Sequence, residues 1–473
     1  MSQLARTRPV EYENYEDWQD WATAEDARNG DDLWRNEERS ELYDYKIIRR
    51  RYDELTDVRA SGDIQRLLFY LNEGLHGNMG GMGSPALYTK AKSGTKQLIE
   101  DYVNEVSLAL QDLASADEKE LSMRDKRACF RRASTCFGRS ALMLSGAGSL
   151  GPFHIGVAKA LSAQNLLPKI ISGASAGSLV TAIIGTHHHE SIIAMFDPDS
   201  GENFDLLIDS QNINEPHARI KVTDLKDLIA AAIPDMTFLE AYEETGRQIN
   251  ISVAPSELHQ RSRLLNASTS PNAFIREAVL ASCAIPGVFP AVTLAAKNAQ
   301  GKRVAYVPSR QWVDGAITHD LPTHRLARQY GVNHFISSQA NPMVLWALQD
   351  PSKNDAASQL ATIYQNGVRD WLRAVYPFAM ESVRHIYPLN TYTRFWFSLM
   401  TQEYTADINI IPRQRFYDPS LLLAALSQEE TATLIREGEY ATWPKVEMIR
   451  TCTKISRTID DTLVKLQGPY VTG

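Results

Sequence analysis

At 473 residues, the chain is about three times the usual length of a domain, so two or three domains with a substantial core are expected. The formal net charge of -8 is modest for this length and argues against nucleic acid as the main partner. The four cysteines are scattered without CxxC spacing, which favours reduced thiols in a cytoplasmic protein over a disulfide or zinc framework.

The sequence predicts neither a secretory signal nor a membrane span. The N-terminus turns acidic and aromatic without the apolar stretch that a signal peptide needs. No segment reaches about 18 consecutive apolar residues. The expected location is therefore cytoplasmic, and any contact with a membrane is expected to be peripheral.

Residues 1–138 are polar and rich in charge, and their patterns predict a helical domain. The predicted helices cover 16–27, 44–61, 64–75 and 94–115. A glycine-rich break at 77–83 indicates a loop rather than a phosphate cradle, because it lacks a preceding strand and a Lys-Ser/Thr pair. A basic helix around 124–132 is more typical of a solvated face than of a patch for anionic membranes.

From Ser140 the sequence pattern changes to short apolar strands that alternate with helices, which predicts an α/β layer with a mainly parallel sheet. The candidate strands are 141–144, 170–172, 249–253, 303–307 and 334–337. After residue 342 the chain returns to helices and ends in a charged amphipathic tail. We therefore expect three regions, at 1–138, 139–342 and 343–473.

Residues 360–400 combine many aromatic side chains with arginines. Pro377 and Pro388 break this segment into short pieces. Aromatic and basic residues on interrupted helices are typical of a surface that lies on lipid, while packing between helices explains the same composition equally well.

The most informative motif is a serine between two glycines, Gly173-Ala174-Ser175-Ala176-Gly177. It follows a short apolar strand and precedes an apolar helix. This context is typical of a nucleophile elbow, a turn that exposes the serine hydroxyl beside backbone N–H groups and a helix N-terminus. Ser175 is therefore the candidate nucleophile.

A second glycine motif, Gly146-Ala147-Gly148-Ser149-Leu150-Gly151, lies directly after the first predicted strand. Dinucleotide binding is a poor explanation, because it requires an acidic residue about 20 positions later, and no Asp or Glu lies between Gly151 and Thr186. The alternative is that its N–H groups face an oxyanion formed at Ser175.

A serine nucleophile needs a base, and no histidine lies in a sequence context that indicates a catalytic base. The run at 187–189 is expected to end the elbow helix, where cationic side chains suit the last carbonyls, rather than to bind a metal. Asp314, in an Asp-Gly-Ala sequence, is by itself more typical of a turn. Its position after an apolar run also allows it to stand at a strand end on the same sheet edge as Ser175.

These three elements, in this order, resemble the patatin-like acyl hydrolases. That family has a glycine-rich oxyanion loop, a GxSxG serine and an Asp-Gly-Gly/Ala aspartate. The resemblance implies a Ser-Asp dyad without histidine, with Ser175 as nucleophile and Asp314 as base. It also implies an oxyanion hole from the N–H groups of the loop residues Gly146, Ala147, Gly148, Ser149 and Gly151, and it makes Gly315 and Ala316 part of the aspartate motif.

The resemblance extends over most of the chain. The segments 42–105, 281–287, 314–342 and 441–445 are similar to the subgroup of triacylglycerol lipases that carry a helical domain before patatin. Many patatins have arginine where this chain has Leu150, and the storage-lipid subgroup tends to be apolar there. This shifts the expected substrate toward neutral lipid.

The implied fold is a patatin-like three-layer α/β/α sandwich with a mainly parallel central sheet and flanking helical regions. The implied function is a lipase that cleaves glycerolipid esters, chiefly triacylglycerol, at a membrane or lipid-droplet surface, with no cofactor and no metal. Phospholipase A and lysophospholipid acyltransferase remain alternatives at the same site. A non-catalytic lipid-binding scaffold and a histidine-dependent hydrolase using a residue such as His319 also remain open, as does the oligomeric state.

Overall fold

The chain forms two compact units, and each is described by itself. Unit 1 comprises Met1–Gly138 and Trp443–Gly473, and unit 2 comprises Arg139–Thr442. The predicted C-terminal region, 343–473, is thus divided between them. The computed structural model describes residues 12–196, 218–257, 260, 262–315, 320–342, 345, 375, 381, 406–414 and 422–467. Ala316, His319 and nearly all of the aromatic segment 360–400 lie outside this part of the chain.

Unit 1 is helical, and the four helices predicted in it are present with their ends shifted by a few residues. Its elements are α1 (Tyr15–Asn29), α2 (Asp31–Asn36), α3 (Tyr45–Ala60), α4 (Ile64–Gly74), η1 (Met79–Gly81), η2 (Pro85–Tyr88), α5 (Gln97–Ser115), α6 (Met123–Phe137), η6 (Trp443–Lys445) and α18 (Val446–Gln467). Among the helices that the structure describes, none is both long and apolar enough to cross a bilayer.

Four of these helices begin at a residue whose side chain caps the first turn. The side chains of Asn14, Asp44, Asp63 and Ser122 each accept a hydrogen bond from the backbone N–H three residues later. Such a cap satisfies an N–H group that the helix itself leaves without a partner, and it contributes about 1 kcal/mol. The local sequence therefore sets where α1, α3, α4 and α6 start.

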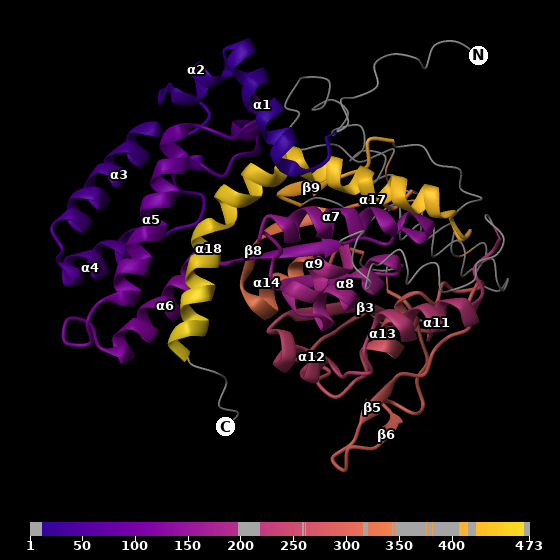
Figure 1. Ribbon diagram of the computed structural model, residues 1–473. Helices are drawn as coiled ribbons and strands as arrows, with labels where there is room; N and C mark the ends of the chain where they lie inside the picture. Colours follow the sequence, from indigo (N-terminus) through magenta and orange to yellow (C-terminus); the bar gives the residue numbers. More distant parts are fainter. Residues whose placement is uncertain are drawn as a thin grey trace, which may run out of the picture. The chain divides into compact units, whose positions relative to one another are not determined.

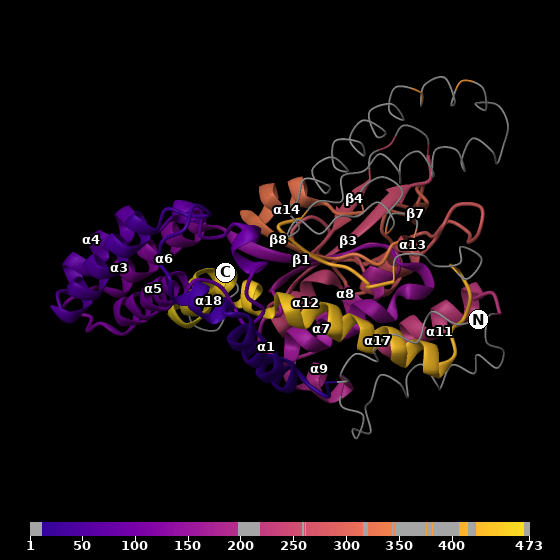
Figure 2. The same ribbon diagram turned by 90° about the horizontal axis from the view of Figure 1, so that it is seen from above.

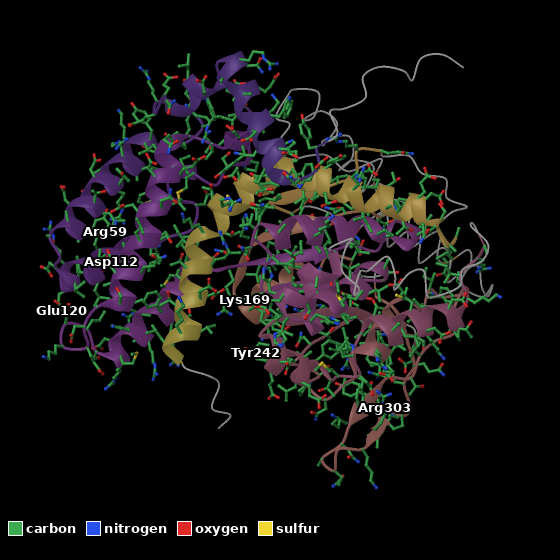
Figure 3. All side chains as sticks on the ribbon, viewed as in Figure 1. Arg59, Asp112, Glu120, Lys169, Tyr242 and Arg303 are labelled. Carbon is green, nitrogen blue, oxygen red and sulfur yellow. The ribbon has the colours of Figure 1, made fainter. Side chains whose placement is uncertain are left out.

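The core of unit 1 forms around α5, which packs against both α3 and α18 (Figure 1). Leu55 of α3, Ile99 and Leu110 of α5, and Ile459 of α18 belong to one buried cluster. On the rim of this packing, Arg59 of α3 contacts Asp112 of α5 at 2.8 Å (Figure 3). The last described helix of the chain thus completes the core of its first domain.

Unit 2 is built on a seven-stranded sheet in the order β4-β3-β2-β1-β8-β9, with β7 also paired to β3. Its strands are β1 (Arg139–Leu144), β2 (Ile170–Gly173), β3 (Gln248–Pro255), β4 (Arg263–Leu265), β7 (Trp312–Asp314), β8 (Val332–Ser338) and β9 (Ile408–Ile410). β1, β2, β3, β8 and β9 are parallel, and β4 and β7 are antiparallel. The mainly parallel sheet is confirmed.

Helices cover both faces of this sheet (Figure 2). Figure 2 shows α7 (Pro152–Ala163) and α8 (Ala176–Thr186) on one side of β1, β3 and β8, and α14 (Thr323–Tyr330) on the other. In the described part of unit 2 the further helices are η3 (Gly148–Leu150), α9 (His189–Phe196), α11 (Val222–Ala232), α12 (Phe238–Thr245), α13 (Ile275–Ser282) and α17 (Gln428–Thr442). The predicted three-layer α/β/α sandwich is confirmed.

One predicted strand lies elsewhere than expected. Residues 303–307 were predicted as a strand of the parallel layer, but β6 (Arg303–Ala305) pairs only with β5 (Ala295–Lys297) in a separate antiparallel hairpin. Every residue of β6 is exposed, so Val304 and Ala305, although apolar, lie in a hairpin that faces solvent. A strand is therefore present where it was predicted, but its predicted place in the parallel layer is wrong.

The helix that follows the glycine motif packs unusually closely against α17. A Cβ atom added at Gly156 of α7 would lie 1.8 Å from the carbonyl oxygen of Ile435, and one added at Gly438 of α17 would lie 2.2 Å from that of Phe153. Both positions therefore require glycine, because a real Cβ does not approach backbone this closely. The contact fixes α7 in the layer above the sheet.

Candidate active site

Ser175 stands at a strained turn between β2 and α8. Its backbone has φ 50° and ψ -127°. The other non-glycine residues with positive φ in the described chain are Asn78 and Asn165, and asparagine tolerates this region far better than serine does. Such backbone strain costs about 1–3 kcal/mol and persists where the surrounding structure imposes it.

The glycines on either side of Ser175 allow the turn to form. A Cβ atom at Gly173 would lie 2.3 Å from the carbonyl oxygen of Gly177, and one at Gly177 would lie 2.4 Å from that of Leu144 at the end of β1. Ala174 donates its N–H to the same Leu144 oxygen at 3.2 Å. The turn can therefore form only because these two positions lack a Cβ atom, which lets the start of α8 lie in direct contact with the ends of β1 and β2.

The pairing of β3 determines where Asp314 lies relative to β2. Val253 pairs with Arg263 of β4 and with Asp314 of β7, so these two strands occupy opposite edges of β3. Ile251 pairs with Leu265 of β4 and also with β2, which places β2 opposite β4 as well. β2 and β7 therefore share one edge of β3.

Along this shared edge the two strands end facing each other. β2 runs parallel to β3 and ends at Gly173, opposite Ile251. β7 runs antiparallel and ends at Asp314, opposite Val253. Since Ser175 follows Gly173 by only one intervening residue, the register brings Ser175 and Asp314 to the same short gap. Both side chains are largely withdrawn from solvent, with residues 8% and 2% exposed.

The segment Ser282–Ala284, at the end of α13, accepts hydrogen bonds from the backbone N–H groups of both Ser175 and Asp314. Ser175 donates its backbone N–H to Oγ of Ser282 at 3.0 Å, and that hydroxyl donates to the carbonyl of Ser252 at 2.8 Å. Asp314 donates its N–H to the carbonyl of Ala284 at 3.0 Å. Sequence reasoning assigned no role to Ser282, although the segment 281–287 that contains it resembles the triacylglycerol lipase subgroup.

The glycine motif lies beside the elbow, and its N–H groups are used unequally. A Cβ atom at Gly151 would lie 3.1 Å from the Cβ of Ala176. The N–H of Ser149 already donates to the carbonyl of Leu422 at 2.9 Å, and that of Gly151 donates within the loop to Gly148.

Two other amides of the motif remain unused. The N–H groups of Ala147 and Gly148 donate to no residue that the structure describes. Gly148 has φ 54°, a left-handed conformation that glycine adopts without strain. Of the five residues predicted for the oxyanion hole, Gly146, Ser149 and Gly151 thus have N–H groups that already donate to acceptors in the protein, and Ala147 and Gly148 do not.

A buried carboxylate, to which sequence reasoning gave no role although it lies in the segment 314–342 that carries the resemblance, contacts the first residue of the glycine motif. Asp320 is 1% exposed, and its Oδ1 accepts the N–H of Gly146 at 2.7 Å. Burial raises the pKa of Asp320 to about 7; the hydrogen bond from Gly146 opposes the rise and the nearby charge of Asp314 adds to it. The Gly146 amide is thus committed to fixing the loop.

His154 is fully buried near this site and has both ring nitrogens engaged. Nε2 donates to the carbonyl of Ser145 at 2.9 Å, which leaves Nδ1 to accept from Oγ of Ser338 at 2.7 Å. Burial lowers the pKa of His154 to about 4. This neutral imidazole ties α7 to the ends of β1 and β8, and neither nitrogen remains to relay a proton from Ser175.

The histidine run lies at the end of α8, although it does not continue that helix. α8 ends at Thr186, His187 is the residue after it, and His189 begins α9. Nδ1 of His187 lies 2.8 Å from the carbonyl of Ile183, so this side chain satisfies a carbonyl of the last turn as predicted for a capping role. Only the first of the three histidines has this position.

Comparison with known proteins matches two family models to this chain. The family model described as "Patatin-like phospholipase" matches residues 142–327, and a "Domain of unknown function (DUF3336)" matches residues 2–135. Among solved structures, VipD from Legionella pneumophila covers 66% of both chains at 14% identity with a TM-score of 0.32, which is too low to inform the fold.

Three curated relatives are named triacylglycerol lipases. Triacylglycerol lipase 4 of Saccharomyces cerevisiae is 32% identical over 94% of this chain and 51% of its own length. Triacylglycerol lipase SDP1L of Arabidopsis thaliana is 31% identical over 90% and 55%, and triacylglycerol lipase ptl2 of Schizosaccharomyces pombe is 30% identical over 95% and 74%. The chain thus spans about half the length of the first two, and it belongs to the patatin-like phospholipase family, in the group that carries a DUF3336 domain ahead of the patatin domain.

Proposed function

We propose that this chain is a serine acyl hydrolase that cleaves carboxylic esters of glycerolipids, with triacylglycerol as the preferred class. The observation that carries the proposal is the register of β3, which brings the elbow serine and the end of β7 to one gap. A strained serine beside a buried carboxylate, with unused amides next to it, is a constellation suited to acyl transfer. The names of the relatives support the same class of reaction.

In the first step, Oγ of Ser175 attacks the ester carbonyl carbon while Asp314 takes the hydroxyl proton. A carboxylate is a weak base for an alcohol, so proton transfer must accompany the attack and benefits from a site that excludes water. Asp314 is buried at the end of β7, which meets this requirement. The carbonyl oxygen then carries the negative charge.

The N–H groups of Ala147 and Gly148 are the donors proposed for this oxyanion. Fixed backbone donors need no reorganisation as charge develops, and a single one contributes about 10² to 10³ in rate. Asp320, through its hydrogen bond with Gly146, acts here as a positioning residue that keeps the loop in place.

The second half of the reaction regenerates the enzyme. The tetrahedral intermediate collapses, the bond to the leaving alcohol breaks, and Asp314 returns its proton to that alcohol. Water then attacks the acyl-enzyme as Asp314 takes its proton, and collapse releases the fatty acid and restores the hydroxyl of Ser175. No oxidant, metal or cofactor enters this scheme.

The preference for neutral lipid rests on two observations. Leu150 is buried in the glycine loop, at a position that offers no charge to a phosphate. Three relatives that match 90–95% of this chain are named triacylglycerol lipases. Because such a substrate gathers in a separate lipid phase, we further propose that the protein acts while bound peripherally to a lipid-droplet or membrane surface, which flotation with artificial droplets tests directly.

The decisive experiment compares Ser175→Ala and Asp314→Asn with Ser172→Ala. Ser172 lies in β2, and its buried hydroxyl has no hydrogen-bond partner among the described residues, so its loss should leave activity unchanged. We expect the first two variants to lose about 10³-fold or more in hydrolysis of triolein emulsions. Parallel assays on phosphatidylcholine vesicles separate lipase from phospholipase activity.

Covalent labelling distinguishes an enzyme from a lipid-binding scaffold. A fluorophosphonate should label the wild type and Ser172→Ala at one residue, and it should not label Ser175→Ala. Full hydrolysis by Ser175→Ala or Asp314→Asn would refute the dyad. A wild type that binds lipid but neither labels nor hydrolyses any ester would favour the scaffold.

A further inference from the structure

The basic helix α6 presents a row of cations that the fold of unit 1 does not use. Its exposed arginines are Arg124, Arg127, Arg131 and Arg132. Nε of Arg127 donates to the carbonyl of Leu466 at 2.7 Å, whereas the other three guanidinium groups have no hydrogen bond or ion pair with any residue that the structure describes. Arg124 and Arg131 lie about two helical turns apart and so on one side of α6, with Arg132 next to them.

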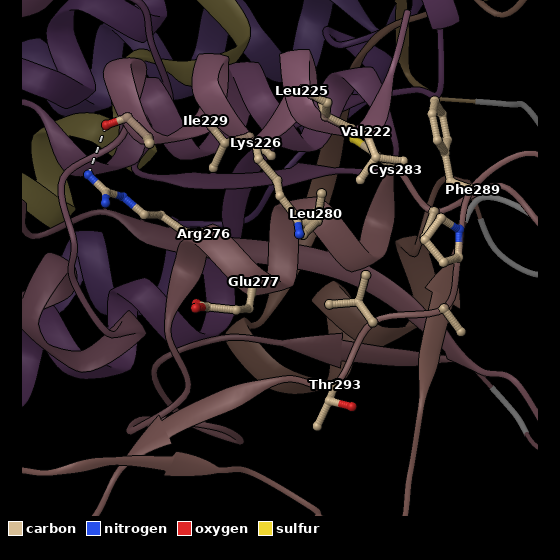
Figure 4. Close-up of a pocket in the computed structure, with 15 residues that line it drawn as sticks. Val222, Leu225, Lys226, Ile229, Arg276, Glu277, Leu280, Cys283, Phe289 and Thr293 are labelled. Atoms are coloured by element: carbon tan, nitrogen blue, oxygen red, sulfur yellow. Dashed lines mark hydrogen bonds between the residues drawn. The ribbon is translucent and has the colours of Figure 1, made fainter.

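Two other arginines show the structural role that these three lack. Arg276 of α13 donates to the carbonyls of Ile233 at 2.7 Å and Ala230 at 2.9 Å, the latter drawn as a dashed line in Figure 4. It thereby ties α13 to the end of α11. Arg59 joins α3 to α5 through Asp112. Each of these side chains is explained by the contact that it makes within the fold, and the free arginines of α6 are not.

The acidic groups around α6 are engaged elsewhere or lie at one end of the row. The carboxylate of Asp125 accepts the hydroxyl of Ser122 at 2.6 Å. Asp461 of α18, the helix that packs against α6, lies close to Arg457 of its own helix. The acidic turn 117–120 comes before the first turn of α6. Within α6 the sequence has five basic residues and one acidic residue, although the whole chain has a formal net charge of -8. The row is therefore a local positive surface on an acidic protein.

An exposed aromatic side chain lies on the side of α4 that faces α6. The side chain of Gln65 donates to the carbonyl of Glu120, just before α6, and Oδ1 of Asn72 accepts from Sγ of Cys129 in α6 at 3.7 Å. Phe69 follows Gln65 by four positions and precedes Asn72 by three, so all three lie on one side of α4. Phe69 is 68% exposed, so its ring lies at the outer edge of the seam between the two helices.

One of the free arginines faces the same seam from α6. Arg132 follows Cys129 by three positions, which places both on one side of the helix. Burial raises the pKa of the Cys129 thiol, and the nearby charge of Arg132 opposes this rise. The outer surface of α6 and α4 thus combines free guanidinium groups with an exposed aromatic ring. This combination is typical of surfaces that lie at the boundary between lipid headgroups and acyl chains.

We propose that the α6 patch, formed by Arg124, Arg131, Arg132 and Phe69, binds the anionic headgroups of a phospholipid surface. The guanidinium groups donate to phosphate oxygens, and the ring of Phe69 inserts beside them. Nucleic acid fits this surface less well, because the chain is acidic overall and the aromatic ring lies beside the cations rather than along an extended basic groove.

The inference goes beyond the proposed function, because it gives a role to unit 1 rather than to the hydrolase site. Most of the described part of unit 1 falls within the match to a domain described as one of unknown function, residues 2–135. Binding to lipid does not require turnover, so it can be measured on the Ser175→Ala protein, which leaves the vesicles chemically intact.

The test measures flotation of the full chain, as Ser175→Ala, with two kinds of vesicle: phosphatidylcholine alone, and phosphatidylcholine mixed with phosphatidylglycerol. The patch variant adds three substitutions, Arg124→Gln, Arg131→Gln and Arg132→Gln. A matched control removes three exposed cations elsewhere in unit 1, where acidic residues are interspersed: Arg39→Gln, Lys46→Gln and Arg50→Gln. Both variants change the net charge equally, and all six side chains are exposed, so circular dichroism should report an unchanged fold.

An arginine near an anionic lipid surface contributes about fivefold to binding, the equivalent of about 1 kcal/mol. The patch variant should therefore bind mixed vesicles about a hundredfold more weakly than its parent, and the control should stay within about fivefold. Binding of the parent should weaken steeply between about 0.1 M and about 1 M salt, because the screening length falls from about 10 Å to about 3 Å. Phe69→Ala should lose about tenfold at either salt concentration, since burial of an apolar ring is not screened.

Several results would overturn the patch. One is an equal loss of binding in the patch variant and the control, which would reduce the effect to net charge. Another is equal binding of the parent to both kinds of vesicle. Binding to single-stranded RNA that the patch variant loses, with no binding to vesicles, would assign the row to nucleic acid instead.

A soluble ester separates this proposal from the proposed function. With Ser175 restored, the patch variant should cleave p-nitrophenyl butyrate at the wild-type rate, because this ester does not require a lipid surface. A parallel loss of butyrate cleavage would mean that the substitutions disturb the whole protein, which also overturns the patch. If the wild type does not cleave butyrate, the proposed function fails, and flotation of the Ser175→Ala proteins still decides whether the patch binds lipid.

Discussion

Replacing Asp320 by asparagine should stabilise unit 2 in alkaline solution and leave its stability in acid almost unchanged. The side chain is fully enclosed, and burial raises its pKa from 3.8 to about 7. The folded protein therefore resists ionisation of this group over about three pH units, and each unit corresponds to about 1.4 kcal/mol. Keeping the charged carboxylate inside the fold thus costs about 4 kcal/mol above neutral pH.

The direction of the effect follows from proton binding. Between about pH 4 and about pH 7 the folded state holds a proton on Asp320 that the unfolded state has released, so the stability of the wild type falls as pH rises through this window. Asparagine has nearly the same shape, stays neutral, and keeps an oxygen to accept the Gly146 N–H. Asp320→Asn should therefore match the wild type near pH 4 and exceed it by up to about 4 kcal/mol near pH 8.

Hydrogen exchange of peptides from β1 and β8, followed by mass spectrometry in increasing urea, measures this difference within unit 2. Whole-chain melting is less suitable, because a protein of two units need not unfold in one step. As a control, Asp320→Ala removes the acceptor of Gly146 and should lose about 1–3 kcal/mol from the unsatisfied amide. If wild type and Asp320→Asn show the same difference in stability at both pH values, Asp320 is not the buried acid inferred here.

Three further substitutions probe other contacts of unit 2. Gly438→Ala brings a Cβ to 2.2 Å from the Phe153 carbonyl, and urea unfolding should show a loss of about 1–3 kcal/mol; an unchanged midpoint would mean that α17 can shift freely. Ser282→Ala removes the acceptor of the Ser175 N–H, so fluorophosphonate labelling should slow about tenfold or more. Labelling of this variant at the wild-type rate would show that the elbow keeps its conformation without this hydrogen bond. Burial lowers the pKa of His154 to about 4, so wild-type stability should fall as pH drops from about 6.5 to about 4. His154→Gln should show a flatter acid profile by circular dichroism, and a profile as steep as that of the wild type would point to another group.

The parts of the site that the sequence predicted are those encoded locally. The elbow at Ser175 combines a strand, a turn of small residues and an apolar helix within a short window, and each component has its own pattern. Asp314 was placed at a strand end because an apolar run precedes it. That the strand before Asp314 ends on the same edge of β3 as the strand before Ser175 depends on the pairing of β2 and β7 with β3, and no local pattern in the sequence indicates this pairing.

Other parts of the site depend on contacts between distant residues. The Ser149 N–H donates a hydrogen bond to the carbonyl of Leu422, and no residue near Ser149 in the sequence indicates a partner so far along the chain. β9 contains only Ile408–Ile410, too short to show a period of alternation. The strand predicted at 303–307 was misplaced for the converse reason, because an apolar pattern appears in an exposed hairpin as well as in a buried strand.

The packing of α18 in unit 1 has a consequence for how the protein is made. Unit 2 is a continuous stretch of sequence, whereas unit 1 needs both its first helices and residues synthesised after all of unit 2. Domains generally fold as units while the ribosome is still adding residues. During synthesis the apolar faces of α5 and α6 therefore stay uncovered, because Ile455, Ile459 and Leu463 emerge only after the whole of unit 2. Unit 1 thus begins to emerge before unit 2 but completes its core only after unit 2, and a ribosome that stalls within unit 2 leaves the core of unit 1 open to chaperones and proteases.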